Sequence, residues 1–228
     1  MTGRMQEAGD LLRRGLNRVG IDAGDEVVAR LVRYCLELEK WNRKINLIAR
    51  NTRLQDIVDR HFLDSLTLVP ILDRLAPVDA TLLDVGSGAG FPGLVLKIVR
   101  PDLKVVLLEP RERRGAFLRH VIRQTGLKDI AVTAARVEEV KAAAGTHAVI
   151  TGRAVADVAT FLNMVAPLAG PETLVICMQG VQGRGGWREG DRVSGFVCAG
   201  IEETQLPFSR MPRFLLLFRK MIRVGSRQ

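Results

Sequence analysis

Cysteine and long apolar runs are both scarce in this chain of 228 residues. The three cysteines, Cys35, Cys177 and Cys198, are scattered and form no Cys-x-x-Cys pair, which argues against a metal centre and a disulfide framework. We expect all three to be small buried hydrophobic residues. No apolar run is long enough to span a membrane, and the first residues contain no apolar core of a signal peptide. A cytoplasmic protein is therefore expected.

Acidic residues are fewer than basic ones, 25 against 34, which gives a formal net charge of +9. Such a balance favours a polyanionic partner, although a solvated basic surface would have the same composition. There is one tyrosine and few aromatics lie among the charges, so base-stacking platforms of the RRM or OB type are not expected. The basic residues gather in three groups: Lys40, Arg43, Lys44, Arg50 and Arg53; Arg111, Arg113, Arg114, Arg119 and Arg123; Arg210, Arg213, Arg219, Lys220, Arg223 and Arg227.

Hydrophobic periodicity divides the chain near residue 76. The first part predicts three helices, one ending before Gly20, one opened by Asp25 and one over Asp56–Leu75. The second part alternates short apolar runs with helical patterns, which is typical of an α/β fold with a parallel sheet. Strands are expected over 81–85, 104–109, 130–134, 147–151 and 173–178, and helices over 92–100, 112–125, 136–144 and 155–168.

The end of the chain follows a different pattern. Residues 196–205 and 213–219 have the pattern of two successive strands, which predicts an antiparallel pair. Six glycines in residues 180–195 predict a flexible loop before them. We therefore expect a helical region over residues 1–76 and a cofactor-binding domain over residues 77–228.

A glycine-rich loop follows the first expected strand and precedes a helix: Asp84-Val-Gly-Ser-Gly-Ala-Gly-Phe-Pro-Gly93. Glycine permits positive φ and close approach of the backbone to a ligand. The acid at position 84 is expected to face the same crevice as the glycines. This pattern resembles motif I of the class I S-adenosylmethionine (SAM) methyltransferases. The overlapping Gly-x-Gly-x-x-Gly also fits a dinucleotide site, or a plain loop.

Acidic residues after the next two expected strands are relevant to whether the loop binds SAM or a dinucleotide. Glu109 ends the second strand, where a carboxylate can accept two ribose hydroxyls, as it also does in NAD enzymes. Glu138 or Glu139, after the third strand, would contact adenine or would be first-turn acids of a helix. These residues leave the choice between SAM and a dinucleotide open.

The absence of two sequence patterns limits which atom of a nucleobase this protein would methylate. Methylation of an exocyclic amine typically uses an Asn/Asp-Pro-Pro-aromatic segment, and the chain contains no Pro-Pro. Methylation of a pyrimidine C5 needs a cysteine nucleophile, usually after proline, and no cysteine here follows proline. A ring nitrogen with an in-plane lone pair needs neither device, because positioning and electrostatics suffice.

The chain resembles the RsmG (GidB) family, bacterial methyltransferases acting on N7 of a guanine in 16S ribosomal RNA. The resemblance covers about residues 36 to 219. It is carried by Leu38-Glu-Lys-Trp-Asn-Arg-Lys-Ile-Asn-Leu47, Arg60-His-Phe-Leu-Asp-Ser65, the glycine loop, Arg136-Val-Glu-Glu139 and Gly152-Arg-Ala-Val-Ala156. It implies a class I SAM-dependent methyltransferase fold, Rossmann-like, with a seven-stranded, mostly parallel sheet and an N-terminal helical extension.

The resemblance also assigns residues. SAM would be held by Gly86, Gly88, Phe91, Glu109, Val137, Glu138 and Arg153, of which Gly88 and Glu109 follow the general class I pattern. The RNA would meet Arg60, His61, Asp64, Ser65, Arg136, Arg153 and Arg213. No residue is assigned as acid or base, and no metal is expected. The implied partner is 16S ribosomal RNA or the small ribosomal subunit, and a monomer is expected.

Two departures and three alternatives accompany this interpretation. Gly152 replaces a serine that is common in the family, and Gln179 replaces a basic residue after the fifth strand. These changes would suit an RNA-binding module that has lost activity. An NAD-dependent oxidoreductase is another alternative, but neither His120 nor His147 lies near a plausible hydride site. Arg60 and Asp64 would equally form an i,i+4 ion pair on a helix surface.

Overall fold

One sheet of eight strands organises the protein. The computed structural model describes residues 2–141 and 143–221, and the strand order is β3-β2-β1-β4-β5-β8-β7-β6. The five strands from β3 to β5 pair in parallel, and the C-terminal strands pair antiparallel. The strands are β1 (Thr81–Val85), β2 (Lys104–Leu108), β3 (Ile130–Thr133), β4 (Val149–Arg153), β5 (Leu174–Gln179), β6 (Arg192–Val193), β7 (Phe196–Gln205) and β8 (Pro212–Lys220).

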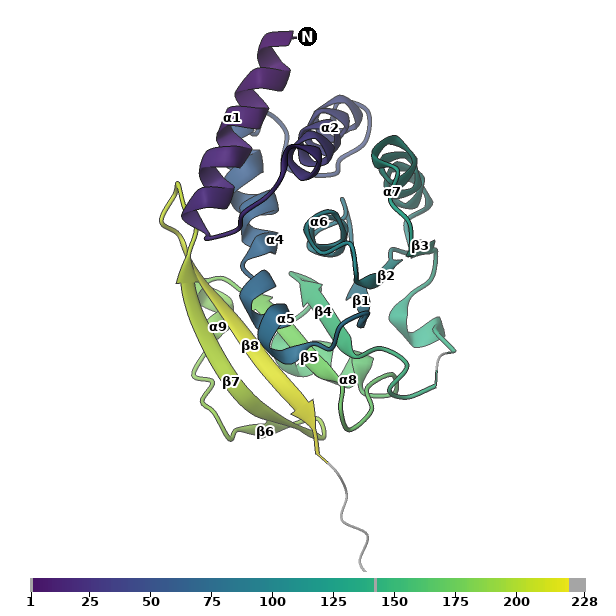
Figure 1. Cartoon of the computed structure of the whole chain (residues 1–228). Coiled ribbons are helices and arrows are strands. Elements are labelled where there is room, and N and C mark those ends of the chain that lie inside the picture. The colour runs from purple at the N-terminus through teal and green to yellow at the C-terminus, as the bar shows by residue number, and fades with distance from the viewer. Residues whose placement is uncertain (1, 142, 222–228) are drawn as a thin grey trace, which may run out of the picture.

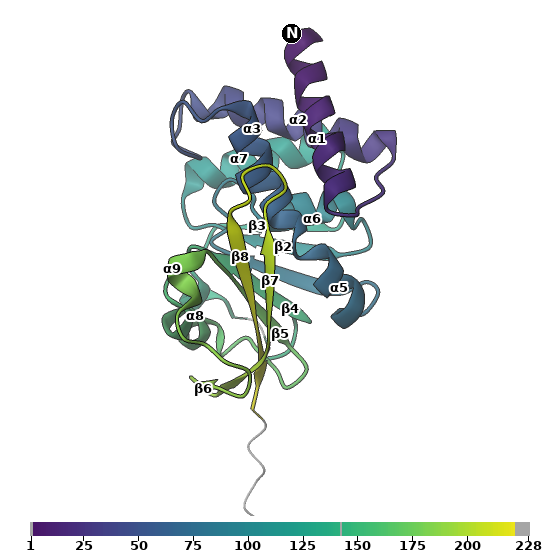
Figure 2. The same ribbon diagram turned by 90° about the vertical axis from the view of Figure 1, so that its left-hand side faces the viewer.

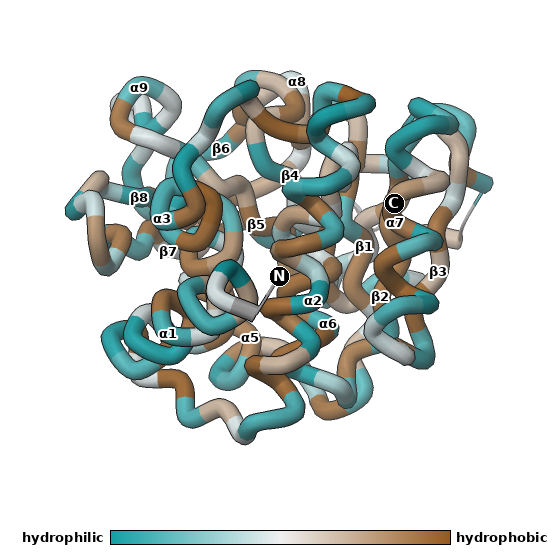
Figure 3. The backbone as a smooth tube through the Cα atoms, turned by 90° about the horizontal axis from the view of Figure 1, so that it is seen from above, coloured by the Kyte–Doolittle hydropathy of each residue, from teal (hydrophilic) through white to brown (hydrophobic). Residues whose placement is uncertain are grey.

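Helices cover both faces of this sheet (Figure 1). On one face lie α1 (Thr2–Arg18), α2 (Asp25–Asn42), α6 (Gly93–Val99) and α7 (Glu112–Thr125), and on the other lies α8 (Val158–Val165). The pleat divides the strand residues between the two cores, since Ile176 packs with the first group of helices and Cys177 with the second. Figure 3 shows hydrophobic residues along the central strands and on the adjoining helix turns.

The α/β prediction is confirmed, with four corrections. The sheet has eight strands and not seven, because β6 adds a two-residue edge to β7. In its described residues, the expected helix over 136–144 is a single 3-10 turn, η2 (Val137–Glu139), after which Val140 is extended and packs on the core of the α8 face. Tertiary packing thus overrides the alanine-rich helical pattern. The expected loop over 180–195 contains the short helix α9 (Val181–Arg184) and β6.

The fourth correction concerns the third N-terminal helix. The predicted single helix over Asp56–Leu75 is a succession of α3 (Leu54–Ile57), a π-helix η1 (Val58–Leu63), α4 (Asp64–Leu66) and α5 (Val69–Leu75). In a π-helix the hydrogen bonds run from residue i to i+5. Here the amide of Asp64 donates to the carbonyl of Asp59. Residues five apart, which would diverge by about 140° on an α-helix, therefore lie on nearly the same face.

This face meets the β7–β8 hairpin, whose tip lies beside the η1 segment (Figure 2). Asp59 is buried, and its two carboxylate oxygens accept the amides of Phe208 (3.0 Å) and Ser209 (2.9 Å). Arg18 lies over the Phe208 ring and donates to the carbonyl of Pro207. The N-terminal helices and the sheet share one continuous hydrophobic core. The division into a helical region over residues 1–76 and a cofactor-binding domain over residues 77–228 therefore stays a prediction.

Candidate active site

The loop between β1 and α6 is built over a buried acid. Asp84 is fully buried, and its Oδ2 accepts the amide of Gly93 at 3.0 Å. A Cβ at Gly93 would lie 2.8 Å from that oxygen, so only glycine allows this approach. The expectation that Asp84 faces the crevice is wrong: strand alternation directs it beneath the loop, where it holds the start of α6. Burial raises its pKa to about 6.

The glycines of the loop adopt the backbone conformation that the sequence predicts. Gly86 has φ +69° and Gly88 has φ +59°, both in the left-handed region that favours glycine. The Gly88 amide donates to Glu109 Oε2 at 2.9 Å, and the Arg111 amide donates to Glu109 Oε1 at 2.8 Å. Glu109 is thus a buried acid at the end of β2 that ties the loop to the start of α7.

A cavity of about 180 Å³ adjoins this loop. Its wall is mostly apolar, with the exposed residues Arg136 and Glu138 among its lining. The lining residues are Val85, Gly86, Leu108, Pro110, Ala135, Arg136, Val137, Glu138, Val155 and Met164. A mostly apolar lining suits an aromatic ring such as adenine. Pro110, Ala135 and Met164 were not predicted, because nothing in their local sequence marks them as ligand contacts.

A cluster of charged side chains lies at the end of β4, next to β1. Asp64, with 4% of its side chain exposed, accepts from Arg153 at 3.1 Å and from Arg213 at 2.7 Å, one arginine on each oxygen. Arg153 also donates to the carbonyl of Arg60 and to Nδ1 of His61. One carboxylate therefore joins segments that are 89 and 149 residues apart in the chain.

Aromatic rings support this cluster. Phe91 is buried, and its ring lies 5.1 Å from the His61 ring and 5.5 Å from the Tyr34 ring, stacked on both. The Arg153 guanidinium lies 5.2 Å from the centre of the Phe91 ring. The Tyr34 hydroxyl donates to the carbonyl of Ala89. Tyr34 was missed by sequence reasoning, although it is the only tyrosine and belongs to the apolar stripe of α2.

The structure brings most of the predicted RNA residues together but not all. His61, Asp64, Arg153 and Arg213 form one hydrogen-bonded group. Ser65 is fully buried, and its hydroxyl donates to the carbonyl of His61, so it faces the helix and not the site surface. Arg60 is exposed and pairs with Asp56 at 3.3 Å. The alternative of an Arg60–Asp64 pair is therefore wrong, and Arg136 lies apart, at the cavity by η2.

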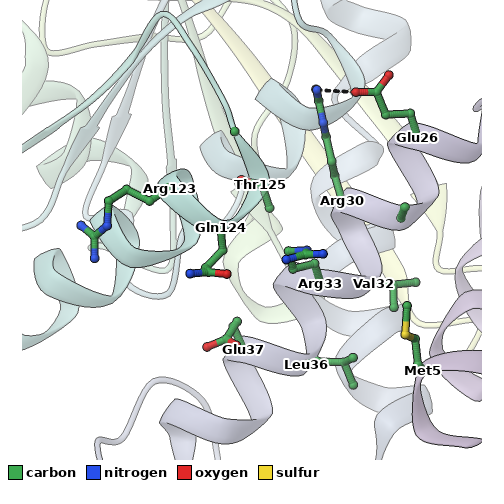
Figure 4. A pocket seen from close by; sticks show the side chains of 12 residues that line it. Met5, Glu26, Arg30, Val32, Arg33, Leu36, Glu37, Arg123, Gln124 and Thr125 are labelled. Carbon is green, nitrogen blue, oxygen red and sulfur yellow. Dashed lines mark hydrogen bonds and ion pairs between the residues drawn. The ribbon is translucent and has the colours of Figure 1, made fainter. Parts of the chain in front are cut away.

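A larger depression of about 580 Å³ lies between α2, the end of α7 and Met5 of α1 (Figure 4). It is lined by charged side chains such as Arg33 and Arg123, and the Glu26–Arg30 ion pair crosses one side of it. None of the predicted site residues lines it. No residue of the glycine loop lines it either, so we do not assign it to the cofactor.

The family of the chain follows from its relatives. The sequence profile of the GidB family, described as rRNA small subunit methyltransferase G, matches residues 27–212. The chain belongs to this family. It is 38% identical over 213 residues to the ribosomal RNA small subunit methyltransferase G of Desulfotalea psychrophila, covering 91% of this chain and 96% of the relative. The corresponding protein of Geobacter metallireducens is 36% identical over 219 residues, covering 93% and 96%.

Solved structures agree on the fold. A SAM-dependent methyltransferase from Aquifex aeolicus superposes with a TM-score of 0.54 at 16% identity, covering 73% of this chain and 93% of that one. A variant of MtNAS in complex with S-adenosylmethionine gives 0.56 at 16% identity, covering 94% and 98%. This GidB-family chain is thus a SAM-dependent methyltransferase, and the alternative of an NAD-dependent oxidoreductase is wrong. His120 pairs with Glu37 and His147 is buried near the start of β4, both outside the glycine loop and the Asp64 cluster.

The two departures from the family pattern are accommodated by packing. A Cβ at Gly152 would lie 2.5 Å from Cε2 of Phe161, so the ring of Phe161 fills the space that a serine would need. The Gln179 side chain occupies the space above Gly183, where a Cβ would lie 1.9 Å from its Oε1. Neither change disturbs the glycine loop or Asp64. They therefore give no structural support to an inactive RNA-binding module.

Restoring the family serine is expected to destabilise this protein. The Gly152→Ser change overpacks a buried site against Phe161, which should cost about 1–3 kcal/mol of unfolding free energy. Gly152→Ser should cost less unfolding free energy when it is made in the Phe161→Leu variant than when it is made in the wild type. Urea denaturation of the wild type, both single variants and the double variant measures the coupling. Strictly additive free energies would show that Phe161 is not the reason for glycine at 152.

Proposed function

We propose that this protein transfers the methyl group of SAM to N7 of a guanine in the 16S ribosomal RNA of the small subunit. The observation that carries the proposal is the composition of the site beside the cofactor loop. It presents arginines and a histidine, and its one central carboxylate, Asp64, is held by two arginines. Such a site can position an anionic RNA without supplying a base, which is what a nucleophilic ring nitrogen needs.

The cysteines support this choice of target. Cys35, Cys177 and Cys198 are all buried, and burial raises the pKa of each thiol. A thiol with a raised pKa is a poor nucleophile, because the thiolate is the reactive form. The covalent route to a pyrimidine C5 therefore has no candidate among these residues. Mapping of 7-methylguanosine in 16S ribosomal RNA from cells with and without the gene tests the proposed product.

The cofactor would be held by the residues that the site brings together. The cavity lined by Leu108 and Val137 would take the adenine, and Gly86 would lie against the ligand backbone. Glu109 keeps lone pairs for the ribose hydroxyls beyond the two amides that it accepts. When bound, SAM supplies a methyl group on a positively charged sulfur. The contacts of Phe91 would come from its backbone, since its ring is buried against Tyr34 and His61.

The rate of transfer is expected to be independent of pH above the pKa of Asp84. That pKa is about 6, so Asp84 is mostly ionised at pH 7 and almost completely ionised from roughly pH 8 upward. N7 carries no proton, so no base has to lose one before the reaction. A single-turnover rate measured between about pH 7 and 9 should stay flat. A rate that rises with pH across this range would require a deprotonated base and would defeat the mechanism.

The electrostatic face for RNA is proposed around the cofactor loop. Arg114 donates to the carbonyl of Asn46 at 3.3 Å, which joins the α2–α3 loop to the start of α7. Lys44 and Arg113 are exposed on these two segments, and Arg111 is exposed beside Glu109. Of the third basic group, Arg223 and Arg227 lie outside the described residues. Arg219 donates to the carbonyl of Glu172, at the opposite end of the sheet from the loop.

RNA affinity should fall steeply with salt, and the slope should depend on this face. Changing Lys44, Arg111 and Arg113 together to glutamine should lower the log–log slope by about 0.7–0.9 for each phosphate that is no longer neutralised. A matched control changes Arg33, Arg123 and Lys128, which carry the same charge but lie near the other end of α7. Filter binding across a salt series measures both. Equal slopes for the two triple variants would place the RNA elsewhere.

We also propose that the protein acts as a monomer in the cytoplasm. No helix in residues 2–141 and 143–221 is both long and apolar enough to cross a membrane. Light scattering after size exclusion, over a range of protein concentrations, tests the monomer.

A further inference from the structure

One hydrogen bond determines which nitrogen of His61 carries the proton. Arg153 Nη2 lies 3.1 Å from His61 Nδ1. A guanidinium can only donate, so Nδ1 must accept and the proton of the neutral ring is on Nε2. Burial lowers the pKa of His61 to about 3, and the charges of Arg153, Arg60 and Arg213 act in the same direction. The ring is therefore a neutral Nε2–H donor near neutral pH.

The His61 ring is also held in place, and its Nε2–H group makes no hydrogen bond within the described residues. Phe91 stacks on it, and Ser65 donates to the carbonyl of the same residue. In the described part of the chain, the buried side-chain nitrogens and oxygens without a partner are Asp84 Oδ1 and His147 Nδ1. His61 Nε2 has no hydrogen-bond partner among these residues either, so it must keep contact with solvent.

Arginine is the residue type that most often recognises guanine, but most of the N–H groups of Arg153 already donate hydrogen bonds within the protein. Three of its five N–H groups are directed to the Arg60 carbonyl, Asp64 and His61. Its two remaining N–H groups cannot bind both O6 and N7 of guanine, because N7 has to keep its lone pair for the methyl group. The base therefore needs a single donor at O6 and nothing at N7.

We propose that His61 Nε2–H selects guanine by donating a hydrogen bond to O6 of the target base. The proposal rests on the proposed function. Guanine has a hydrogen-bond acceptor, O6, at this position, whereas adenine has an amino group that donates. A ring nitrogen that can only donate therefore binds guanine and disfavours adenine. Arg153 then acts as a positioning residue, since it fixes the tautomer. A neutral ring also adds no positive charge beside a base that becomes positive as N7 gains the methyl group, and no proton moves in that step.

The kinetic test compares His61→Leu and His61→Gln with the wild type on a 16S ribosomal RNA transcript. His61→Leu removes the donor and should lower kcat/KM by roughly tenfold or more, with the SAM dissociation constant from calorimetry unchanged. His61→Gln keeps an N–H donor and should recover part of the loss. Thermal unfolding of each variant shows that it is folded. Wild-type kcat/KM in folded His61→Leu would overturn the proposal.

The spectroscopic test detects the tautomer without any substrate. Protein labelled with nitrogen-15 histidine should show His61 with its proton on Nε2 and no titration between roughly pH 5 and 8. In the Arg153→Met variant the ring loses the donor to Nδ1 and a nearby charge, so its pKa should rise while burial still holds it below the usual value, and the proton should no longer be confined to Nε2. A proton on Nδ1 in the wild type, or titration near neutrality, would overturn the assignment.

These outcomes separate the two claims. If the wild type places no methyl group on guanine N7, the proposed function and the role of His61 both fail. If the wild type methylates N7 and His61→Leu does so equally well, only the role of His61 fails.

Discussion

Replacing Asp64 with asparagine is expected to reduce methyl transfer by more than roughly 100-fold, because small displacements of positioned groups cost that much. The carboxylate is buried and joins Arg153 to Arg213, one on each oxygen. Its loss leaves two partly buried guanidinium groups facing each other without a compensating charge. Removing one partner of a buried ion pair typically costs about 3–5 kcal/mol, so stability should fall as well. Both effects are measurable by urea denaturation and by transfer of labelled methyl to ribosomal RNA.

A matched control lies in the same helical segment. Asp56 also meets two arginines, Arg53 at 2.9 Å and Arg60 at 3.3 Å, but both partners are exposed. Exposed pairs contribute about 0–1 kcal/mol, so Asp56→Asn should change stability little and keep the activity. Similar effects of the two changes would mean that Asp64 is an ordinary surface acid. Activity of Asp64→Asn near that of the wild type would remove this cluster from the mechanism.

Replacing Gly86 with valine is expected to abolish SAM binding while the protein remains folded. Gly86 has φ +69°, and a Cβ there would lie 3.0 Å from Cγ2 of Val155. Both residues line the cavity proposed for the cofactor, so the branched side chain would fill the space where the ligand lies. Calorimetry should show no SAM binding at concentrations that saturate the wild type.

Backbone strain alone must be separated from the loss of the pocket. A left-handed β-branched residue costs about 1–2 kcal/mol wherever it occurs. Gly126, at the C-terminus of α7, has φ +65°, and a Cβ there would have no atom within 4 Å, so Gly126→Val carries the same strain away from the cavity. It should lose stability and bind SAM normally. Normal SAM affinity in Gly86→Val would contradict the assignment of the cavity.

Local patterns allowed much of the fold to be predicted. The bounds of β1 and α7 match the expected ranges because each is a clear apolar pattern with sharp ends, α7 ending at the left-handed Gly126. The failures occur where packing competes with local preference. The alanine-rich run after Glu139 predicts a helix, but Val140 is drawn into the core of the α8 face. The π-helix η1 was not predicted from the sequence, and its Asp59 contacts residues 149 and 150 positions further along the chain, which local patterns do not reveal.

The candidate site divides in the same way. The glycine loop is contiguous in sequence, so its conformation could be predicted from its residues. The partners of Asp64 could not, because they lie 89 and 149 residues away and a local i,i+4 pairing with Arg60 was equally reasonable. The resemblance to the family named these residues as neighbours of the RNA. It did not indicate that the side chains of this group are hydrogen-bonded to one another, or that Ser65 is fully buried.

The position of β8 imposes an order on the assembly of the enzyme. This strand follows the other seven strands of the sheet in chain order, yet it is inserted between β5 and β7, and Arg213 at its start supplies the second partner of Asp64. Chains are synthesised from the N-terminus, so the cofactor loop and Asp64 emerge long before Arg213. A nascent chain ending before Pro212 would contain every proposed SAM contact and still lack a complete charged cluster. A protein whose proposed substrate belongs to the ribosome thus becomes competent only after the ribosome has synthesised β8.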